Sequence, residues 1–415
     1  MMNWGAHDLT NIAEKYGTPY YLYDLDAARV HLAALREHLP GNVEVLYCVK
    51  ANPNPRIITA FQELVPGLDI SSGGEVELAC AAGWSPSKMS FAGPGKTESE
   101  LRLSISRGLG SISIESVTEL NRISALALEQ KRTVRCLLRI NPASAPKGFA
   151  MKMGGLASQF GVQEEDSAAV FKQALNAPGI KLAGIHIFSG TQCLELPALV
   201  ENVEQTLGIA ASLATANNVT LEEINLGGGI GVAYFPGQED LSPTQVSRAL
   251  ADSILAFRTR HPRFVQTKIV VELGRYLIAR FGVYVTRVVD AKLTRDRRFV
   301  IMDGGMNHCF PATGNFGQLV KKNYPVENLS RSVAENEWVP QELVGPLCTP
   351  LDSMARNVAL PLCETGDLIA VKNCGAYSFS ASPLMFLSHA TPLELLSFKG
   401  ELSVARRRIL ASEFV

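Results

Sequence analysis

Short apolar segments alternate with helical patterns between about residues 20 and 275, and this alternation limits the possible folds more than any other feature of the chain. Helical periodicity lies between most of the segments, for example in Leu25–His38, Gly74–Ala82, Val117–Glu129, Ala168–Asn176 and Pro197–Ala216. Repeated βα units of this kind predict a parallel sheet covered by helices. The nine predicted strands are Tyr20–Tyr23, Val45–Val49, Leu68–Ser71, Met89–Ala92, Ser111–Glu115, Val134–Asn141, Leu182–Ser189, Glu223–Leu226 and Lys268–Glu272.

Nine strands are one too many for a closed eightfold barrel, so we expect Tyr20–Tyr23 to belong elsewhere and the barrel to start at Val45. After Arg275 the long helical patterns stop, which indicates an antiparallel β domain. We predict a barrel over residues 25–278 and a β-sandwich-like domain of residues 1–24 and 279–415. The strands predicted after Arg275 are Gly282–Leu293, Arg298–Met302, Asp367–Val371 and Leu402–Leu410, separated by proline-rich loops such as Val339–Pro350.

Composition excludes several classes of protein. The 415 residues are 47% hydrophobic and 19% charged, as in globular enzymes, and the net charge of −1 gives no electrostatic case for binding nucleic acid or an anionic membrane. No apolar run is long enough to span a bilayer, and the N-terminus lacks the pattern of a signal peptide. The eight cysteines show neither a C-x-x-C pair nor zinc-like spacing. We therefore expect a cytoplasmic protein with reduced thiols and no metal site.

A lysine at the end of an apolar strand is the first candidate functional residue. In V-L-Y-C-V-K-A-N-P-N-P (Val45–Pro55), Lys50 follows the apolar run and turn-forming residues come directly after it. Desolvation disfavours the charged form of an amine, so an interior lysine is costly as a cation. Two interpretations stay open: a lysine that reaches solvent or pairs with a carboxylate, and an amine with a lowered pKa that forms a Schiff base.

Polar residues or glycines follow nearly every predicted barrel strand, at the end where barrels of this type carry their active sites. This recurrence predicts a cradle for a polar cofactor. In chain order the strand ends carry Lys50, Asp69 with S-G-G-E, Glu115, Arg139, H-I-F-S-G-T-Q (His186–Gln192), the glycines 227–229, and E-L-G-R (Glu272–Arg275).

The glycine-rich turn N-L-G-G-G-I-G (Asn225–Gly231) offers backbone N–H groups that can approach a phosphate, although glycine also serves in ordinary tight turns. Arg275 adds a fork-shaped cation that suits phosphate. Glu272 either keeps a ring nitrogen protonated or is an ordinary ion-pair residue. A lysine imine, a phosphate nest and a carboxylate for a ring nitrogen are the contacts that pyridoxal 5'-phosphate requires.

Six motifs resemble the fold-type III pyridoxal-phosphate decarboxylases, the family of the ornithine, arginine and diaminopimelate decarboxylases. They are Y-C-V-K-A-N, L-D-I-S-S-G-G-E, N-L-G-G-G-I-G, E-L-G-R, G-P-L-C-T-P-L-D and C-G-A-Y. The resemblance covers almost the whole chain. It implies an alanine-racemase-like (β/α)8 TIM barrel followed by a C-terminal β domain, and the activity of a carboxy-lyase.

The resemblance also implies roles for single residues. Lys50 is expected to bind the cofactor covalently, Glu272 to face its ring nitrogen, and Arg139 to lie beside the ring. Cys348 is expected to come from the partner subunit of a head-to-tail homodimer and to protonate the product, whereas a free cysteine is otherwise most often a small buried apolar residue. The remaining cofactor-binding candidates are Asp69, His186, Phe188, Gly228, Gly229, Gly274, Arg275 and Tyr377.

Two positions depart from the family pattern. In family members a carboxylate directly after the catalytic cysteine holds the distal amine of the substrate, but here that position is Thr349. A hydroxyl cannot replace the carboxylate charge, although Asp352 can partly compensate. Phe188 stands where the family places a histidine against the cofactor ring, while His186 matches an earlier histidine. We expect Thr349, Asp352 and Tyr377 to bind the substrate.

Three further stretches resemble the subgroup that decarboxylates modified amino acids in natural-product assembly: A-G-P-G-K-T-E-S-E-L, G-G-L-A-S-Q-F-G, and C-T-P-L-D with F-L-S-H. The substrates of that subgroup are siderophore intermediates and aminoacyl groups on carrier proteins. We therefore expect a substrate whose far end is acylated or carboxylated. The alternatives are a diaminopimelate or ornithine/lysine decarboxylase that acts on the free amino acid, and a non-catalytic regulatory binding protein of the same fold. A racemase is disfavoured because it lacks the G-P-L-C-T motif.

Overall fold

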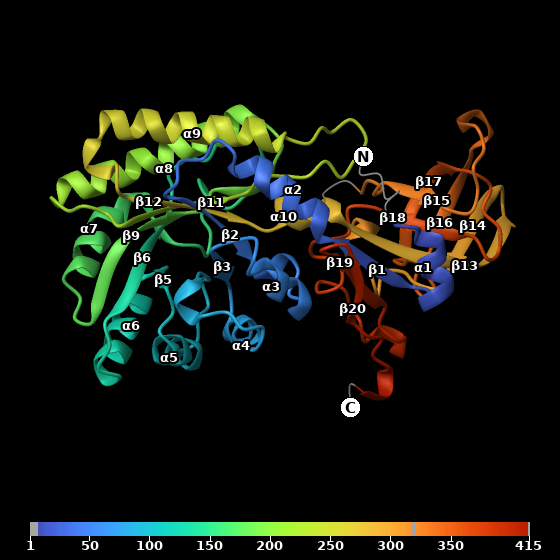
Figure 1. Ribbon diagram of the computed structural model, residues 1–415, viewed down its shortest axis with the longest axis horizontal. Coiled ribbons are helices and arrows are strands. Elements are labelled where there is room, and N and C mark those ends of the chain that lie inside the picture. The colour runs from blue at the N-terminus through green and yellow to red at the C-terminus, as the bar shows by residue number, and fades with distance from the viewer. Residues whose placement is uncertain (1–6, 317–320, 414–415) are drawn as a thin grey trace. The chain divides into compact units, whose positions relative to one another are not determined.

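The computed structural model describes residues 7–316 and 321–413 (Figure 1). The chain forms two compact units. One contains residues 29–232 and 239–276, and the other contains residues 1–28, 233–238 and 277–415. The two are called the barrel unit and the β unit below.

The barrel unit contains a closed ring of eight parallel strands, because β12 pairs with β2 and β5 pairs with β6. These strands are mostly buried, which explains their nearly continuous apolar sequences. This ring confirms the predicted eightfold barrel. Around the barrel the strands follow the order β2 (Val43–Cys48), β3 (Gly67–Ile70), β4 (Met89–Phe91), β5 (Ser111–Ile114), β6 (Val134–Asn141), β9 (Ile180–Ile187), β11 (Glu223–Gly228) and β12 (Lys268–Leu273).

Helices follow the barrel strands along the chain and lie outside the ring of strands (Figure 1). Helices α8 and α9 pack against each other. Those within the barrel unit are α3 (Pro55–Phe61), α4 (Gly73–Ala81), α5 (Glu98–Arg107), α6 (Val117–Glu129), α7 (Glu164–Leu175), α8 (Leu196–Ala216) and α9 (Pro243–Arg260). Helix α2 (Leu25–Arg36) precedes the first barrel strand, and helix α10 (Arg275–Ile278) follows the last one.

Two of the strand-to-helix turns are fixed by the same exchange of hydrogen bonds. At the start of α4, the Ser72 hydroxyl accepts the N–H of Glu75 at 3.2 Å, and the Glu75 carboxylate accepts the N–H of Ser71 at 2.7 Å. Ser116 and Glu119 repeat the arrangement at the start of α6. The serine hydroxyl satisfies an N–H group in the first turn of the helix, and the glutamate carboxylate satisfies the N–H group of the residue before the cap. The exchange thus holds the carboxyl ends of β3 and β5 in place.

The β unit is built around a nine-stranded sheet that includes the N-terminal strand. Strand β1 (Tyr20–Asp24) runs antiparallel to β13 (Gly282–Thr294) and parallel to β19 (Leu393–Phe398). Helix α1 (Leu9–Tyr16) packs its apolar face on these strands through Leu9, Ile12 and Ala13. The other strands are β14 (Arg297–Met302), β15 (Val326–Asn328), β16 (Val339–Val344), β17 (Ser353–Leu360), β18 (Leu368–Val371) and β20 (Glu401–Arg406).

Several local predictions were wrong. Val339–Pro350 was predicted as a loop, but its first half forms β16, which pairs with β14 and β17. Pro340 is tolerated because it lies near the start of that strand. The predicted strand Leu402–Leu410 is too long, since β20 ends at Arg406. Helices α3, α5 and α9 and strands β15, β17 and β19 were not predicted. The limits predicted for the two domains stay a prediction.

Candidate active site

Lys50 lies two residues beyond a strand, whereas the predicted strand Val45–Val49 placed it directly after the last strand residue. Strand β2 ends at Cys48, and Lys50 is the middle residue of a 3-10 turn (Val49–Ala51). The turn continues into α3 because the Asn52 carboxamide accepts the N–H of Asn54 at 3.1 Å, and Asn54 caps the helix. This local geometry places Lys50 at the carboxyl end of β2.

The Lys50 amine pairs with a buried carboxylate while its side chain stays accessible. Its Nζ lies 2.9 Å from Oδ2 of Asp69, and the side chains are 41% and 0% exposed. Burial and the nearby Glu272 raise the pKa of Asp69, and the Lys50 cation opposes them. The Nζ atom also lies 6.0 Å from the centre of the Phe188 ring. Lys50 is therefore held by a carboxylate and is also reachable by a second molecule.

Glu272 is a buried carboxylate on β12, held through both of its oxygens. Its Oε1 accepts a hydrogen bond from the Asn225 carboxamide at 2.6 Å, and its Oε2 lies 3.3 Å from Nε2 of His186. Burial by itself raises the pKa of Glu272, but His186, Lys50 and Asn225 together lower it below its ordinary value. The other ring nitrogen of His186 lies 3.0 Å from the Ser113 hydroxyl. The Glu272 carboxylate is thus held as an anion in the barrel interior.

Arg139 pairs with a carboxylate at the neighbouring strand end. Its Nη1 lies 2.7 Å from Oε1 of Glu115, and its guanidinium carbon lies 4.9 Å from the centre of the Phe160 ring. Burial tends to raise the pKa of Glu115, but Arg139 and Lys96 lower it overall. Lys96 is itself buried and lies 3.0 Å from Glu119. One ion pair therefore joins β6 to the end of β5, and the other joins the segment after β4 to the first turn of α6.

The glycine turn after β11 has room for no side chain. A Cβ atom on Gly228 would lie 1.8 Å from the carbonyl oxygen of Glu272, and one on Gly229 would lie 2.2 Å from that of Gly190. Gly229 also has a φ of +97°, which favours glycine. The Asn225 carboxamide accepts the N–H of Gly227 at 2.9 Å and so shapes the turn. Only glycine fits at these two positions, and a turn without side chains is of the kind that lets a phosphate approach backbone N–H groups.

The structure brings ten of the predicted residues to one end of the barrel. These residues fit pyridoxal 5'-phosphate: an accessible amine, a buried anionic carboxylate for the ring nitrogen, and a side-chain-free turn near an arginine for the phosphate. In chain order they are Lys50, Asp69, Arg139, His186, Phe188, Gly228, Gly229, Glu272, Gly274 and Arg275. Their individual roles stay predictions.

Residues 25–279 match the family model described as "Pyridoxal-dependent decarboxylase, pyridoxal binding domain". The chain belongs to this family of decarboxylases. The decarboxylase is 36% identical to the "L-glutamyl-[BtrI acyl-carrier protein] decarboxylase" of Niallia circulans, over 100% of this chain and 96% of the relative. It is 32% identical to the "2-[(L-alanin-3-ylcarbamoyl)methyl]-2-hydroxybutanedioate decarboxylase" of Staphylococcus aureus, over 92% and 94% of the two chains.

A solved structure and a further relative support membership of this family. Diaminopimelate decarboxylase from Helicobacter pylori, complexed with L-lysine, superposes with a TM-score of 0.87 at 27% identity over 98% of both chains. The diaminopimelate decarboxylase of Aquifex aeolicus is 30% identical over 96% of this chain and 91% of its own. The predicted family, fold, cofactor and carboxy-lyase activity are thereby confirmed: the protein is a pyridoxal-phosphate-dependent decarboxylase.

The remaining predicted residues lie in the β unit. Cys348 has an exposed thiol, so it does not serve as a buried apolar residue. Asp352 is buried, and its two oxygens accept the N–H groups of Met306 at 2.6 Å and Leu347 at 2.9 Å. Its carboxylate thus holds the loop that carries Cys348, and its role as a substrate ligand stays a prediction. Thr349 and Asp352 line one cavity of about 380 Å³.

Tyr377 lies in the C-G-A-Y turn, half-buried and with a φ of +59°. Two residues earlier, a Cβ atom on Gly375 would lie 1.9 Å from the carbonyl oxygen of Ile278. Only glycine fits there, which explains how the chain can present Tyr377 from so tight a turn. Its predicted contacts with phosphate and substrate remain untested.

Sequence reasoning missed several residues of the barrel network. Asn225, which orients Glu272 and the glycine turn, stands in the motif N-L-G-G-G and was not assigned a role. Lys96 stands in A-G-P-G-K and follows an apolar strand, as Lys50 also does. Ser113 gave no signal, because a single serine on an apolar strand is ordinary. These residues act on other side chains, and pairwise contacts of that kind cannot be read from strand ends alone.

Proposed function

We propose that this decarboxylase removes the α-carboxylate of a derivatised amino acid, either an aminoacyl group on a carrier protein or a siderophore-type intermediate. The observation that carries the proposal is Thr349, a hydroxyl where a distal ammonium would need a carboxylate. The names of the relatives from Niallia circulans and Staphylococcus aureus support it. The runner-up is decarboxylation of free diaminopimelate, which the names of several other relatives favour.

The site residues of the barrel unit have separate roles in this proposal. Lys50 would hold the cofactor through its accessible amine. Glu272 keeps the proton on the ring nitrogen, because its anionic form is stabilised by His186 and Asn225. Gly228 and Gly229 hold the phosphate. The cofactor supplies an electron sink for the electron pair that remains when the bond to CO2 breaks.

The α-carbon then needs a proton. Cys348 of the partner subunit donates it from the exposed thiol, in a homodimer that shares its two active sites. No helix among residues 7–316 and 321–413 is long and apolar enough to cross a membrane. Because all eight cysteines are free thiols, a reducing compartment such as the cytoplasm is our proposal for its location.

A comparison of substrates tests the proposal. Release of CO2 is measured from a glutamyl carrier protein, a citryl-diaminopropionate conjugate, free diaminopimelate and free ornithine. We expect one of the two derivatised substrates to give the highest kcat/KM. Faster turnover of a free diamino acid would transfer the assignment to the runner-up. CO2 release from none of the four would contradict both assignments.

A further inference from the structure

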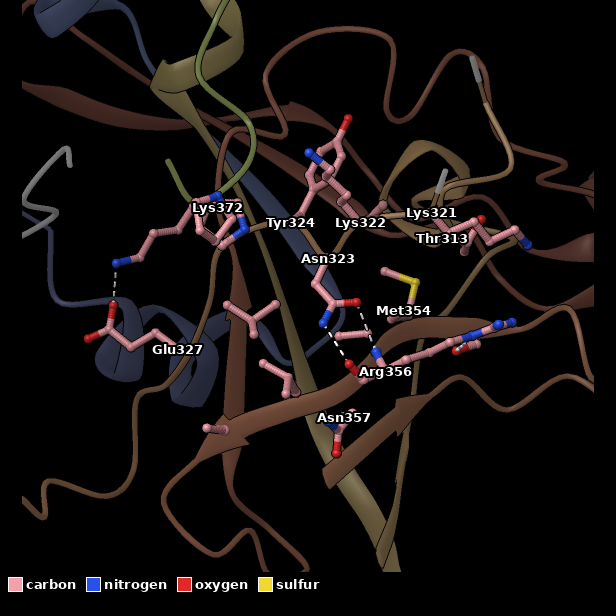
Figure 2. A pocket seen from close by; sticks show the side chains of 18 of the residues that line it. Thr313, Lys321, Lys322, Asn323, Tyr324, Glu327, Met354, Arg356, Asn357 and Lys372 are labelled. Carbon is pink, nitrogen blue, oxygen red and sulfur yellow. Dashed lines mark hydrogen bonds and ion pairs between the residues drawn. The ribbon is translucent and has the colours of Figure 1, made fainter. Parts of the chain in front are cut away.

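The β unit contains a large cavity with a basic wall and an apolar floor (Figure 2). Its volume is about 890 Å³, near the upper end of the range for pockets that hold drug-sized molecules. Strand β17 and the segment 321–327 form much of its lining. The apolar part includes Tyr324, Met354, Ala355, Val358 and Trp338.

Positive charge exceeds negative charge in this wall. Four cations line the cavity, namely Lys321, Lys322, Arg356 and Lys372, against two carboxylates, Glu327 and Glu335. Lys372 lies 2.6 Å from Glu327, so that pair is neutral (Figure 2).

Two of the cations meet neutral groups. The Lys321 amine donates to the Asn315 carboxamide, and Nε of Arg356 donates to the Ser353 hydroxyl at 3.2 Å. Neither cation has a carboxylate partner in the part of the chain that the structure describes. Such a pair of cations beside a cavity is suited to an anionic group such as a phosphate ester.

Arg356 is held in place before any ligand arrives. The Asn323 carboxamide donates to the carbonyl oxygen of Arg356 at 2.7 Å and accepts its N–H at 2.9 Å. Figure 2 shows both bonds across the cavity edge. Because this exchange fixes the backbone of β17 to the segment carrying Lys321, less ordering is needed when a ligand binds.

Arg356 and Ser353 also line the smaller cavity that contains Thr349 and Asp352. The two cavities are therefore neighbours on the same strand. A substrate whose far end, away from the reacting carbon, lies near Thr349 can extend past Arg356 into the larger cavity. A free diamino acid has no such extension, whereas an amino acid attached to a long arm has one.

We propose that the larger cavity holds the phosphopantetheine arm of an aminoacyl carrier protein, with its phosphate bound by Lys321 and Arg356. The amide-linked chain of the arm packs along the floor formed by Tyr324 and Met354. A citrate-derived small molecule would leave most of the apolar floor uncovered. This inference rests on the carrier-protein branch of the proposed function.

Binding of the isolated arm tests the inference without catalysis. The protein is first loaded with pyridoxal phosphate, so that its cofactor phosphate site is filled. Calorimetry then compares 4'-phosphopantetheine, pantetheine and inorganic phosphate. We expect 4'-phosphopantetheine to bind at least tenfold more tightly than either of the other two probes.

Variants locate the binding. Lys321→Ala and Arg356→Ala are each expected to raise the Kd for 4'-phosphopantetheine at least tenfold and to leave pantetheine binding unchanged. Arg356→Lys keeps the charge and is expected to recover part of the affinity. The control is Lys292→Ala, an exposed lysine on β13 outside the cavity, which should bind as the wild type does. Circular dichroism and bound cofactor verify that each variant is folded.

The outcomes separate this inference from the proposed function. Equal binding of pantetheine and its phosphate ester, or no binding of either, overturns the inference. If Lys321→Ala changes the oligomeric state of the protein in solution but not the affinity for 4'-phosphopantetheine, the cavity is assigned to a second copy of the chain. That result also overturns the inference. If the arm binds as expected but no CO2 is released from the glutamyl carrier protein, the cavity assignment stands and the substrate assignment fails.

Discussion

The imidazole Nε2 of His186 lies 3.3 Å from Oε2 of Glu272, with both side chains buried inside the barrel. The pair explains how a carboxylate can stay anionic although it is buried. Burial raises the pKa of Glu272, yet His186, Lys50 and Asn225 lower it overall. An anion fixed in this way can stabilise a proton on a ring nitrogen that faces it.

Replacement of this anion is the first prediction. Glu272→Gln keeps the shape of the side chain and its bond with Asn225 but removes the charge. We expect kcat to fall on the order of 10²-fold or more, as when a preorganised electrostatic group is removed from an enzyme site. Steady-state CO2 release measures it, with bound cofactor quantified in parallel. A kcat within threefold of wild type would show that the ring nitrogen does not depend on Glu272.

The raised pKa of Glu75 leads us to expect that the free energy of unfolding depends on pH. Burial raises its pKa from an ordinary 4.5 to about 7, against the opposing N–H bond from Ser71. A carboxyl with a raised pKa stabilises the folded chain fully below its ordinary pKa, and this contribution is lost as pH rises through 7. The wild type should therefore lose on the order of 2 kcal/mol between pH 5 and pH 8 from this group.

Glu75→Gln removes that titration and still accepts the N–H of Ser71. Urea denaturation at pH 5 and pH 8 should show a smaller loss of stability for the variant than for the wild type. The matched control is Glu77→Gln, an exposed residue of the same helix, which should follow the wild type. Parallel pH curves for Glu75→Gln and the wild type would refute the assignment.

The barrel could be predicted from the sequence because its strands are short apolar runs that end in polar residues. Lys50, Asp69 and Glu272 were found as strand-end residues, and the structure brings them together. Strand β17 was missed because arginine and asparagine interrupt its apolar pattern. Its position depends on pairing with β16, a contact between segments that the local pattern does not encode.

The substrate-facing part of the site could be predicted less completely. Thr349 was identified because it departs from a family motif, not because of its own chemistry. Arg356 carries no such signal, since its importance comes from its place between two cavities. A lone arginine in a sequence is most often a solvated surface residue. Cavities form from segments that lie far apart along the chain, so their charge cannot be summed from sequence.

Thr349→Glu tests the assignment of substrate class. It introduces a carboxylate where family members bind a distal ammonium, so kcat/KM for free diaminopimelate should rise by roughly tenfold or more, as a charge-assisted hydrogen bond allows. Thr349→Gln has similar length without charge and serves as control. Equal effects of the two substitutions would mean that no distal ammonium reaches this position.

Cys348→Ala tests the proton donor. Loss of a positioned general acid lowers kcat by about 10²-fold or more. The amount of bound cofactor should be unchanged, because Cys348 lies in the β unit and is not one of the predicted cofactor-binding residues of the barrel. Cys80→Ala, which replaces a partly exposed cysteine of α4, is the control and should keep full activity. Full activity of Cys348→Ala would assign protonation to another group.

The central claim is that Lys50 carries the cofactor, and its most direct test is reduction of the holoenzyme with borohydride followed by peptide mass spectrometry. The reduced phosphopyridoxyl group should be found on the peptide containing Lys50, with none on the peptide containing Lys96, a buried lysine that pairs with Glu119. Lys50→Ala should lose the label. Label on a different lysine, or none on the wild type, would contradict the account.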